Sequence, residues 1–162
     1  IKESCEQIEI VGSLRRLRPH VNDIDIIAVP KFTITRDQTL FGDPVEENRL
    51  DTFIASLCNN NLFTLETNGP KIKRLRSNSN GSSIPIDIYV ATAASWWTLK
   101  LIRTGSREHN ILLARRAIEK HMVLKADGTG LLSAGGDIIS INSEEDIFRH
   151  LEVPFRPPEQ RE

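Results

Sequence analysis

The sequence has few of the residues that would make a disulfide-stabilised or membrane-spanning protein. Its 162 residues include two cysteines, Cys5 and Cys58, which are too few for a disulfide scaffold and lack the spacing of a metal site. We therefore expect two reduced thiols in a cytoplasmic protein. No apolar run approaches the roughly 20 residues that a membrane helix needs, and no secretory signal pattern can be read.

Charge of one sign is also not in excess. The net charge is −1 and the pI is about 6.5, which argues against a protein that coats nucleic acid through charge alone. Basic residues nevertheless gather locally, so basic faces are expected on parts of the surface. The clusters are Arg15, Arg16 and Arg18; Lys71, Lys73, Arg74 and Arg76; and Arg103, Arg107, Arg115 and Arg116.

The size and composition suit a soluble globular protein. A chain of this length can form one domain or two small subdomains that share a core. Hydrophobic residues make up 39% and charged residues 27%, which is ordinary for such a protein. The chain opens with Ile1 rather than Met, which is consistent with a trimmed product that lacks part of its N-terminus.

Short apolar and alternating runs predict a strand-rich first half. The predicted strands are residues 5–12, 24–29, 62–67, 70–75 and 84–91. Residues 31–42 are expected to form a loop. Residues 43–58 predict a helix, with Asp43 as its N-cap, Pro44 at the first helical position and Glu46 completing a capping box.

The second half is richer in predicted helices. Thr92 is expected to cap a helix through residues 96–100, Ser106 to open a second, and Ser143 to begin a short third. This change in pattern predicts a subdomain boundary near Thr92.

Three aspartates interrupt apolar strands. Asp23 and Asp25 are two residues apart and therefore project from the same face of a strand, and Asp87 lies in another strand predicted for the same sheet. Neighbouring carboxylates repel one another unless a cation lies among them. Hard oxygen ligands select Mg²⁺ or Mn²⁺, and two such ions are the usual apparatus of nucleotidyl transfer. An Asp-x-Asp pair alone is more often structural, so the prediction depends on the whole set.

A phosphate site is predicted beside these carboxylates. Gly12-Ser13 leads from a strand into a helical turn, where backbone N–H groups can bind phosphate oxygens. Arg15 and Arg16 follow at once, and their guanidinium groups suit phosphates.

The segments GSLRR, NDIDI and IPIDIYV, in this order, resemble the nucleotidyltransferase signature of the DNA polymerase beta-like, family X enzymes. RTGSREHN is similar to the family's Thr-Gly-Ser segment, and SEEDIF with the VPFRPPEQRE ending is similar to its thumb. The resemblance covers nearly the whole chain. It implies an α+β fold, with a nucleotidyltransferase palm (a mixed β-sheet with flanking helices) over residues 1–91 and a small α/β thumb-like subdomain over residues 92–162.

The resemblance also implies roles for residues at matching positions. Asp23 and Asp25 would hold two ions, Mg²⁺ or Mn²⁺, while Asp87 would hold only the catalytic ion and accept or orient the proton of the primer 3′-hydroxyl. The nucleotide-binding residues would be Gly12, Ser13, Arg16, Asn22, Gly105 and Asn110. The DNA-binding residues would be Lys71, Lys73, Arg74 and Arg76.

The chain departs from the family at several positions. Ile102 and Arg103 stand where the polymerases usually place two aromatic residues, and Pro85 stands where an arginine often precedes the third carboxylate. The upstream lyase and finger-like subdomains have no counterpart, so the chain resembles minimal palm-plus-thumb members from viruses, phages and bacteria. His109 could touch substrate, although a histidine at a helix start is more often a surface or capping residue.

The sequence is compatible with three functions. The first is a monomeric, template-directed DNA polymerase that adds deoxynucleoside triphosphates to primed or gapped DNA in repair. The second is a nucleotidyltransferase that modifies RNA or protein, or works without a template. The third is a nucleic-acid-binding module whose active site is not used.

Overall fold

A five-stranded mixed sheet forms the centre of the fold. The structure, a computed structural model, describes residues 1–36, 44–79 and 83–162. The strands stand in the order β1-β2-β7-β6-β5, with β2 and β7 parallel and the other neighbours antiparallel. They are β1 (Cys5–Ile10), β2 (Ile24–Pro30), β5 (Phe63–Asn68), β6 (Ile72–Ser77) and β7 (Pro85–Val90). These are the five strands that the apolar and alternating runs predict.

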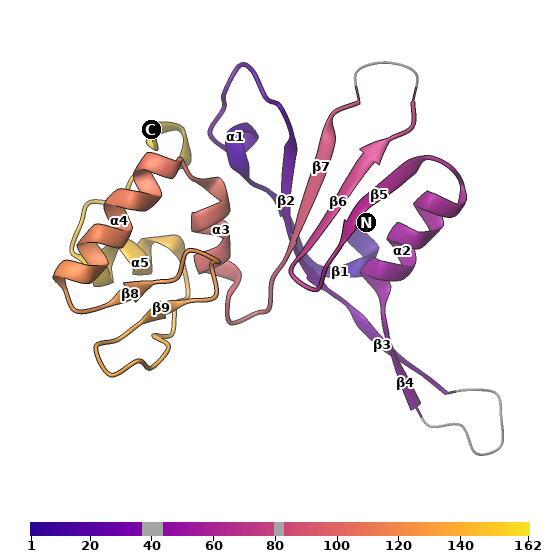
Figure 1. Cartoon of the computed structure of the whole chain (residues 1–162). Helices are drawn as coiled ribbons and strands as arrows, with labels where there is room; N and C mark the ends of the chain where they lie inside the picture. Colours follow the sequence, from indigo (N-terminus) through magenta and orange to yellow (C-terminus); the bar gives the residue numbers. More distant parts are fainter. Residues whose placement is uncertain (37–43, 80–82) are drawn as a thin grey trace.

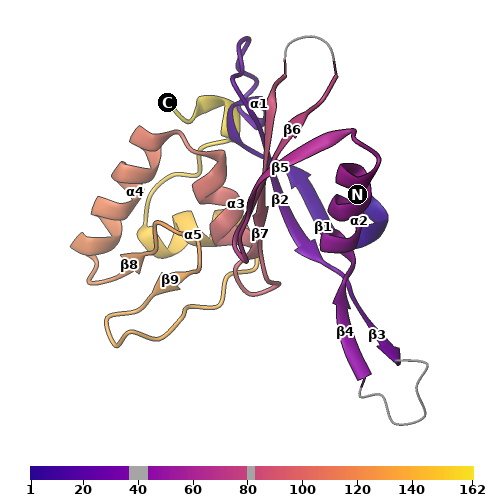
Figure 2. The same ribbon diagram turned by 45° about the vertical axis from the view of Figure 1, so that its right-hand side comes forward.

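Helices cover both faces of this sheet (Figures 1 and 2). On one face, α2 (Arg49–Asn59) buries Leu50 and Ile54 against β2, β6 and β7, beside the short η1 (Lys2–Ser4). On the other face, α3 (Trp96–Thr104) packs Trp96 and Leu99 against Ile27 of β2. The short helix α1 (Gly12–Arg15) follows β1 directly.

The prediction for residues 31–58 is wrong in its first half. A hairpin of β3 (Phe32–Arg36) and β4 (Pro44–Asn48) occupies part of the expected loop and the expected first helical turns. The helix begins at Arg49, because the Asn48 side chain caps it by accepting hydrogen bonds from the N–H groups of Leu50 (3.0 Å) and Asp51 (3.3 Å). Asp43 and residues 37–42 lie outside the described residues.

The capping role expected of Thr92 is also wrong. Ser95, not Thr92, is the N-cap of α3, and it makes no side-chain capping bond. Thr92 instead closes a turn with Ser95, whose N–H donates to the Thr92 hydroxyl oxygen at 3.2 Å. The predicted caps Ser106 and Ser143 are confirmed.

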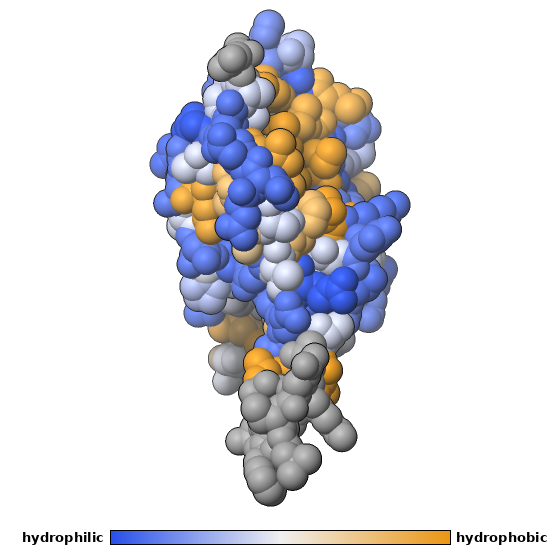
Figure 3. Space-filling model, turned by 90° about the vertical axis from the view of Figure 1, so that its right-hand side faces the viewer, coloured by the Kyte–Doolittle hydropathy of each residue, from blue (hydrophilic) through white to orange (hydrophobic). Residues whose placement is uncertain are grey.

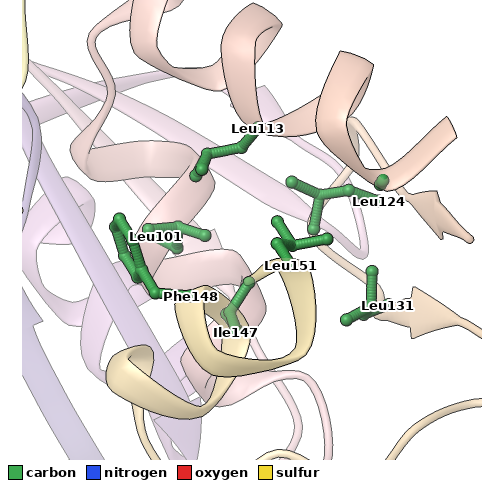
Figure 4. Packing of buried hydrophobic residues seen from close by; sticks show 8 residues of the cluster. Leu101, Leu113, Leu124, Leu131, Ile147, Phe148 and Leu151 are labelled. Atoms are coloured by element: carbon green, nitrogen blue, oxygen red, sulfur yellow. The ribbon is translucent and has the colours of Figure 1, made fainter. Parts of the chain in front are cut away.

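A second core lies in the C-terminal part of the chain (Figure 4). The end of α3 meets α4 (Arg107–Glu119), the two-stranded β8 (Val123–Leu124) and β9 (Leu131–Leu132), and α5 (Glu144–Leu151). The chain then ends through η2 (Pro158–Gln160). Seven of the buried residues are labelled in the figure: Leu101, Leu113, Leu124, Leu131, Ile147, Phe148 and Leu151.

The β3–β4 hairpin extends away from the body of the molecule (Figures 1 and 2). Phe32, Ile34 and Val45 on it are 52%, 74% and 57% exposed. Figure 3 looks onto the side of the molecule that carries α2 and shows hydrophobic atoms at the base of this hairpin. No helix in the described ranges is long and apolar enough to cross a membrane.

A buried ion cluster joins α1 to the C-terminal core. Arg15 donates from both terminal nitrogens to Glu144, and also to the Thr104 hydroxyl at 2.6 Å. Arg161, which is fully buried, donates to the same carboxylate at 2.8 Å. The two guanidinium groups share one carboxylate, so each of these charges has an opposite charge in contact with it, as buried charges require.

Glu144→Ala should therefore destabilise the protein by about 3–5 kcal/mol, because it leaves the buried Arg161 guanidinium without its carboxylate. Urea unfolding followed by circular dichroism measures this change. Glu145→Ala, at the adjacent exposed position of the same helix, is the matched control and should change the free energy of unfolding by less than about 0.5 kcal/mol. If both substitutions lowered the free energy of unfolding by the same amount, a stabilising role of the ion cluster at Glu144 would be contradicted.

Candidate active site

The strand register brings the three aspartates together on one face of the sheet. Asp25 on β2 stands directly opposite Asp87 on the parallel β7. Asp23 precedes β2 by one residue and has the same parity as Asp25. Ile27, two residues beyond Asp25, packs against α3, so the carboxylates point to the α3 side of the sheet. Asp87 is 2% exposed.

The crowding of these carboxylates is reflected in the electrostatics of Asp25. Its pKa is raised to about 6, chiefly by burial and then by the charges of Asp23 and Asp87, while a hydrogen bond with Tyr89 and the charge of Arg103 oppose the shift. Ionised Asp25 is therefore unfavourable in this site without a nearby cation.

Gly12 is required where the turn into α1 passes the carboxylates. Its φ is +66°, and a Cβ at this position would lie 2.0 Å from Asp25 Oδ2. No side chain fits into that space, so glycine lets the backbone of the turn approach the carboxylate closely.

A cavity of about 580 Å³ opens between the sheet and the C-terminal helices. It is lined by all six residues predicted to bind nucleotide and by two of the three aspartates. These are Gly12, Ser13, Arg16, Asn22, Gly105 and Asn110, with Asp23 and Asp25. The tertiary structure thus unites segments that lie more than seventy residues apart in the sequence.

Two polar side chains in the cavity wall keep unused hydrogen-bonding atoms. Arg16 donates to the carbonyl oxygen of Thr104, while its buried Nε has no partner among the described residues. Asn110 donates to the carbonyl oxygen of Ile102 at 2.8 Å, and its buried Oδ1 likewise has none there. Gly105, which follows Thr104 with a φ of +71°, would bring a Cβ within 3.0 Å of the Arg16 guanidinium.

The sequence prediction did not include several other residues of the cavity. Polar or charged members are His20, Arg103, Ser106 and Arg107, and the apolar wall consists of Ile102, Ile111, Ala114, Leu124 and Ala126. Arg103 stacks on the Tyr89 ring, with its guanidinium carbon 4.1 Å from the ring centroid. Arg107 directly follows the Thr-Gly-Ser segment, and this position is the one feature of the sequence that could have indicated that Arg107 lines the cavity.

The carboxylates suit a divalent metal in their chemistry. Asp23, Asp25 and Asp87 offer hard oxygen ligands, and a cation would relieve the strain on ionised Asp25. Within residues 1–36, 44–79 and 83–162, however, no three acidic, histidine or cysteine side chains are already arranged to hold one ion. Both oxygens of Asp87 accept hydrogen bonds from Arg74 instead.

The four basic residues predicted to face DNA do not form one surface. Lys73 is 5% exposed and lies on the α2 side of the sheet, where it pairs with Asp51 at 2.6 Å. Arg74 pairs with Asp87 on the opposite face. Each of the other two also has an acidic partner within the chain: Lys71 with Asp127 and Arg76 with Glu66.

His109 is a core residue rather than a surface residue. Its backbone N–H donates to the capping hydroxyl oxygen of Ser106 at 3.2 Å, but the residue is 1% exposed and its ring centroid lies 5.7 Å from that of Phe148. Burial, together with the charges of Arg161 and Arg156, lowers its pKa to about 4. It does not line the cavity.

Comparison with known proteins agrees with this fold. Residues 100–162 match the family model described as "DNA polymerase beta thumb". The chain is 30% identical over 152 residues to the "DNA polymerase/3'-5' exonuclease PolX" of Bacillus subtilis (strain 168). That match covers 93% of this chain but 23% of PolX, so the chain spans about a quarter of its curated relative.

Solved structures show the same fold. A ternary P/T complex of Leishmania infantum polymerase beta superposes with a TM-score of 0.75 at 23% identity, covering 96% of this chain and 67% of that one. Its ternary gap complex gives 0.75 at 22% identity, covering 96% and 62%. The mixed α+β fold is therefore that of a polymerase beta-like protein. Together with the thumb and PolX matches, this fold supports a family X polymerase-like protein.

Asp25→Asn should stabilise the metal-free protein at pH 7.5 by about 1–3 kcal/mol. The pKa of Asp25 is raised to about 6 from 3.8, so its contribution to stability is present at low pH and is lost as pH rises through about 6. Thermal unfolding at pH 7.5 and pH 5 measures the gain, which should shrink at pH 5. A variant no more stable than the wild type at pH 7.5 would contradict the electrostatic strain at Asp25.

His109 should make the protein less stable as pH falls from about 6.5 to 4. Its lowered pKa means that the unfolded chain binds more protons in this window, which costs up to about 3 kcal/mol. Urea unfolding across the window should show a shallower decline for His109→Phe. His150→Gln, at an exposed position of α5, is the control and should decline like the wild type.

Proposed function

We propose that this chain is the nucleotidyl-transfer unit of a DNA polymerase and adds a deoxynucleotide to a primer 3′-hydroxyl, with gap filling in repair as its role. One observation carries the proposal: a single cavity contains Asp23, Asp25 and all six residues predicted to hold a nucleotide. We further propose that the chain acts as a monomer and that its thumb subdomain begins at residue 92.

The nucleotide would lie along the cavity with its phosphates at α1. Ser13, the Arg16 guanidinium and the backbone N–H of Asn22 would bind the β- and γ-phosphates. Gly105 would pass beside the sugar, and the free Oδ1 of Asn110 is a buried acceptor in the same cavity as the apolar wall on which a base can pack.

The carboxylates would supply the reaction centre beside the phosphates, where Gly12 at the start of α1 passes close to Asp25. Two bound Mg²⁺ ions would neutralise the phosphate charge and favour ionisation of the attacking hydroxyl. The primer 3′-oxygen bonds to the α-phosphorus, and the bond from this phosphorus to the oxygen bridging the β-phosphate breaks. Asp87 is the residue we assign to orient the hydroxyl and receive its proton, and Arg16 is placed to hold the departing pyrophosphate.

A second candidate keeps this chemistry and changes the acceptor to RNA, protein or an untemplated strand. It is favoured by one observation, the acidic partners of the four basic residues expected to face duplex DNA. Extension of gapped DNA, single-stranded DNA and RNA primers, each in Mg²⁺ and in Mn²⁺, separates the two. Preference for the gapped duplex supports the first function, and preference for either single strand supports the second.

Asp23→Asn and Asp87→Asn should each lower the rate of nucleotide addition by at least about a hundredfold, because each removes an oxygen ligand from the reaction centre. Single-turnover primer extension measures the rates, with circular dichroism to verify folding. Asp137→Asn, at an exposed position that does not line the cavity, is the matched control and should extend primers like the wild type. Extension at the normal rate by either active-site variant would overturn the mechanism.

A further inference from the structure

Arg74 donates two hydrogen bonds to the carboxylate of Asp87, the third of the three aspartates. It stands directly opposite Asp87 in the antiparallel pairing of β6 and β7. Its Nε donates to Asp87 Oδ1 at 2.6 Å, and its Nη2 donates to Oδ2. The Asp87 side chain is 3% exposed, whereas that of Arg74 is 45% exposed and reaches the carboxylate from the solvent side.

This two-point contact fixes the orientation of the carboxylate. A single donor would allow the Asp87 carboxylate to rotate about its Cβ–Cγ bond, but a planar guanidinium that meets both oxygens sets its plane. A carboxylate offers about four lone-pair sites, so each oxygen of Asp87 keeps a site for a cation or a hydroxyl. The contact with Arg74 therefore orients Asp87 without blocking it.

Neighbouring basic residues cannot take over this contact. Arg76 shares the strand face with Arg74 but pairs with Glu66, and Lys73 lies on the other face. Among the described residues, Arg74 is the one whose side chain hydrogen-bonds to the Asp87 carboxylate. Asp87 in turn is the strand partner of Asp25, so its orientation decides where the two carboxylates can meet a common ligand.

We propose that Arg74 is the positioning residue of the third carboxylate, holding Asp87 so that its free lone pairs face Asp25, and that this residue therefore serves divalent-metal binding rather than DNA contact. The proposal rests on the proposed function, because it gives Asp87 a role at the reaction centre. Groups that hydrogen-bond to a metal-ligating carboxylate commonly change metal affinity or activity by about 10–100-fold when they are removed.

Mn²⁺ titration of the whole chain, followed by the electron paramagnetic resonance signal of free Mn²⁺, tests this inference without catalysis. We expect Arg74→Gln and Arg74→Lys to weaken Mn²⁺ binding by about tenfold or more, because neither side chain has the planar guanidinium that donates to both carboxylate oxygens. Asp87→Asn should weaken it at least as much. Arg76→Ala, on the same strand face, should keep the wild-type Mn²⁺ affinity.

Single-turnover extension then adds a readout that a purely structural role would not move. The maximal rate of nucleotide addition should fall by about 10–100-fold in Arg74→Gln, while the nucleotide concentration at half-maximal rate stays within about threefold, because Arg74 does not line the nucleotide cavity. Thermal unfolding shows whether each variant is folded. If Arg74→Gln does not fold, Arg74→Lys, which keeps the charge, decides the result.

The outcomes separate this inference from the proposed function. Mn²⁺ binding by Arg74→Gln or Arg74→Lys that equals or exceeds that of the wild type overturns the positioning role, even if the wild type extends primers. Wild-type binding that does not depend on Asp87 also overturns it. If the wild type binds Mn²⁺ through Asp87 and Arg74 but extends no acceptor, the proposed function fails and the positioning role stands.

Discussion

The parallel pairing of β2 with β7 is the constraint on which the rest of the site depends. It places Asp25 directly opposite Asp87 and turns both toward α3, at the end of β2 where Gly12 passes within contact of Asp25. Ionised Asp25 in this position costs free energy, as its raised pKa indicates, chiefly because it is buried and also because Asp23 and Asp87 lie near it. The surrounding structure balances that cost with guanidinium groups: Arg74 bonds to Asp87, and Arg103 stacks on Tyr89 beside Asp25.

The two adjacent arginines of α1 connect this sheet to the C-terminal core in different ways. Arg15 enters the buried ion cluster with Glu144, whereas Arg16 faces the cavity and binds the Thr104 carbonyl. The cavity therefore has one wall from the sheet and one from α3 and α4, and the buried ion cluster holds the two walls together. Any displacement of the C-terminal core would change the cavity and the ion cluster together.

Local patterns were sufficient for much of the fold and for part of the site. Residues two apart in a strand share a face whatever surrounds them, so the pairing of Asp23 with Asp25 followed from spacing alone. The caps Ser106 and Ser143 were also readable, because a cap bonds to backbone only three residues away. The start of α2 could not be predicted from local sequence, because the pairing of β4 with β3 keeps residues 44–48 extended and places the cap at Asn48.

The order of residues already specifies the available chemistry: three carboxylates in apolar strands, a glycine-serine turn and arginines after it. Which of these groups meet depends on how the chain folds. It placed Lys73 and Arg74 on opposite faces, so that one binds Asp51 and the other Asp87, and it buried His109, which a helix start would leave exposed. Asp87 has Pro85 at the position where the family often has an arginine, and its arginine partner is Arg74 of β6 instead. Partners across a sheet are set by register and not by distance along the chain.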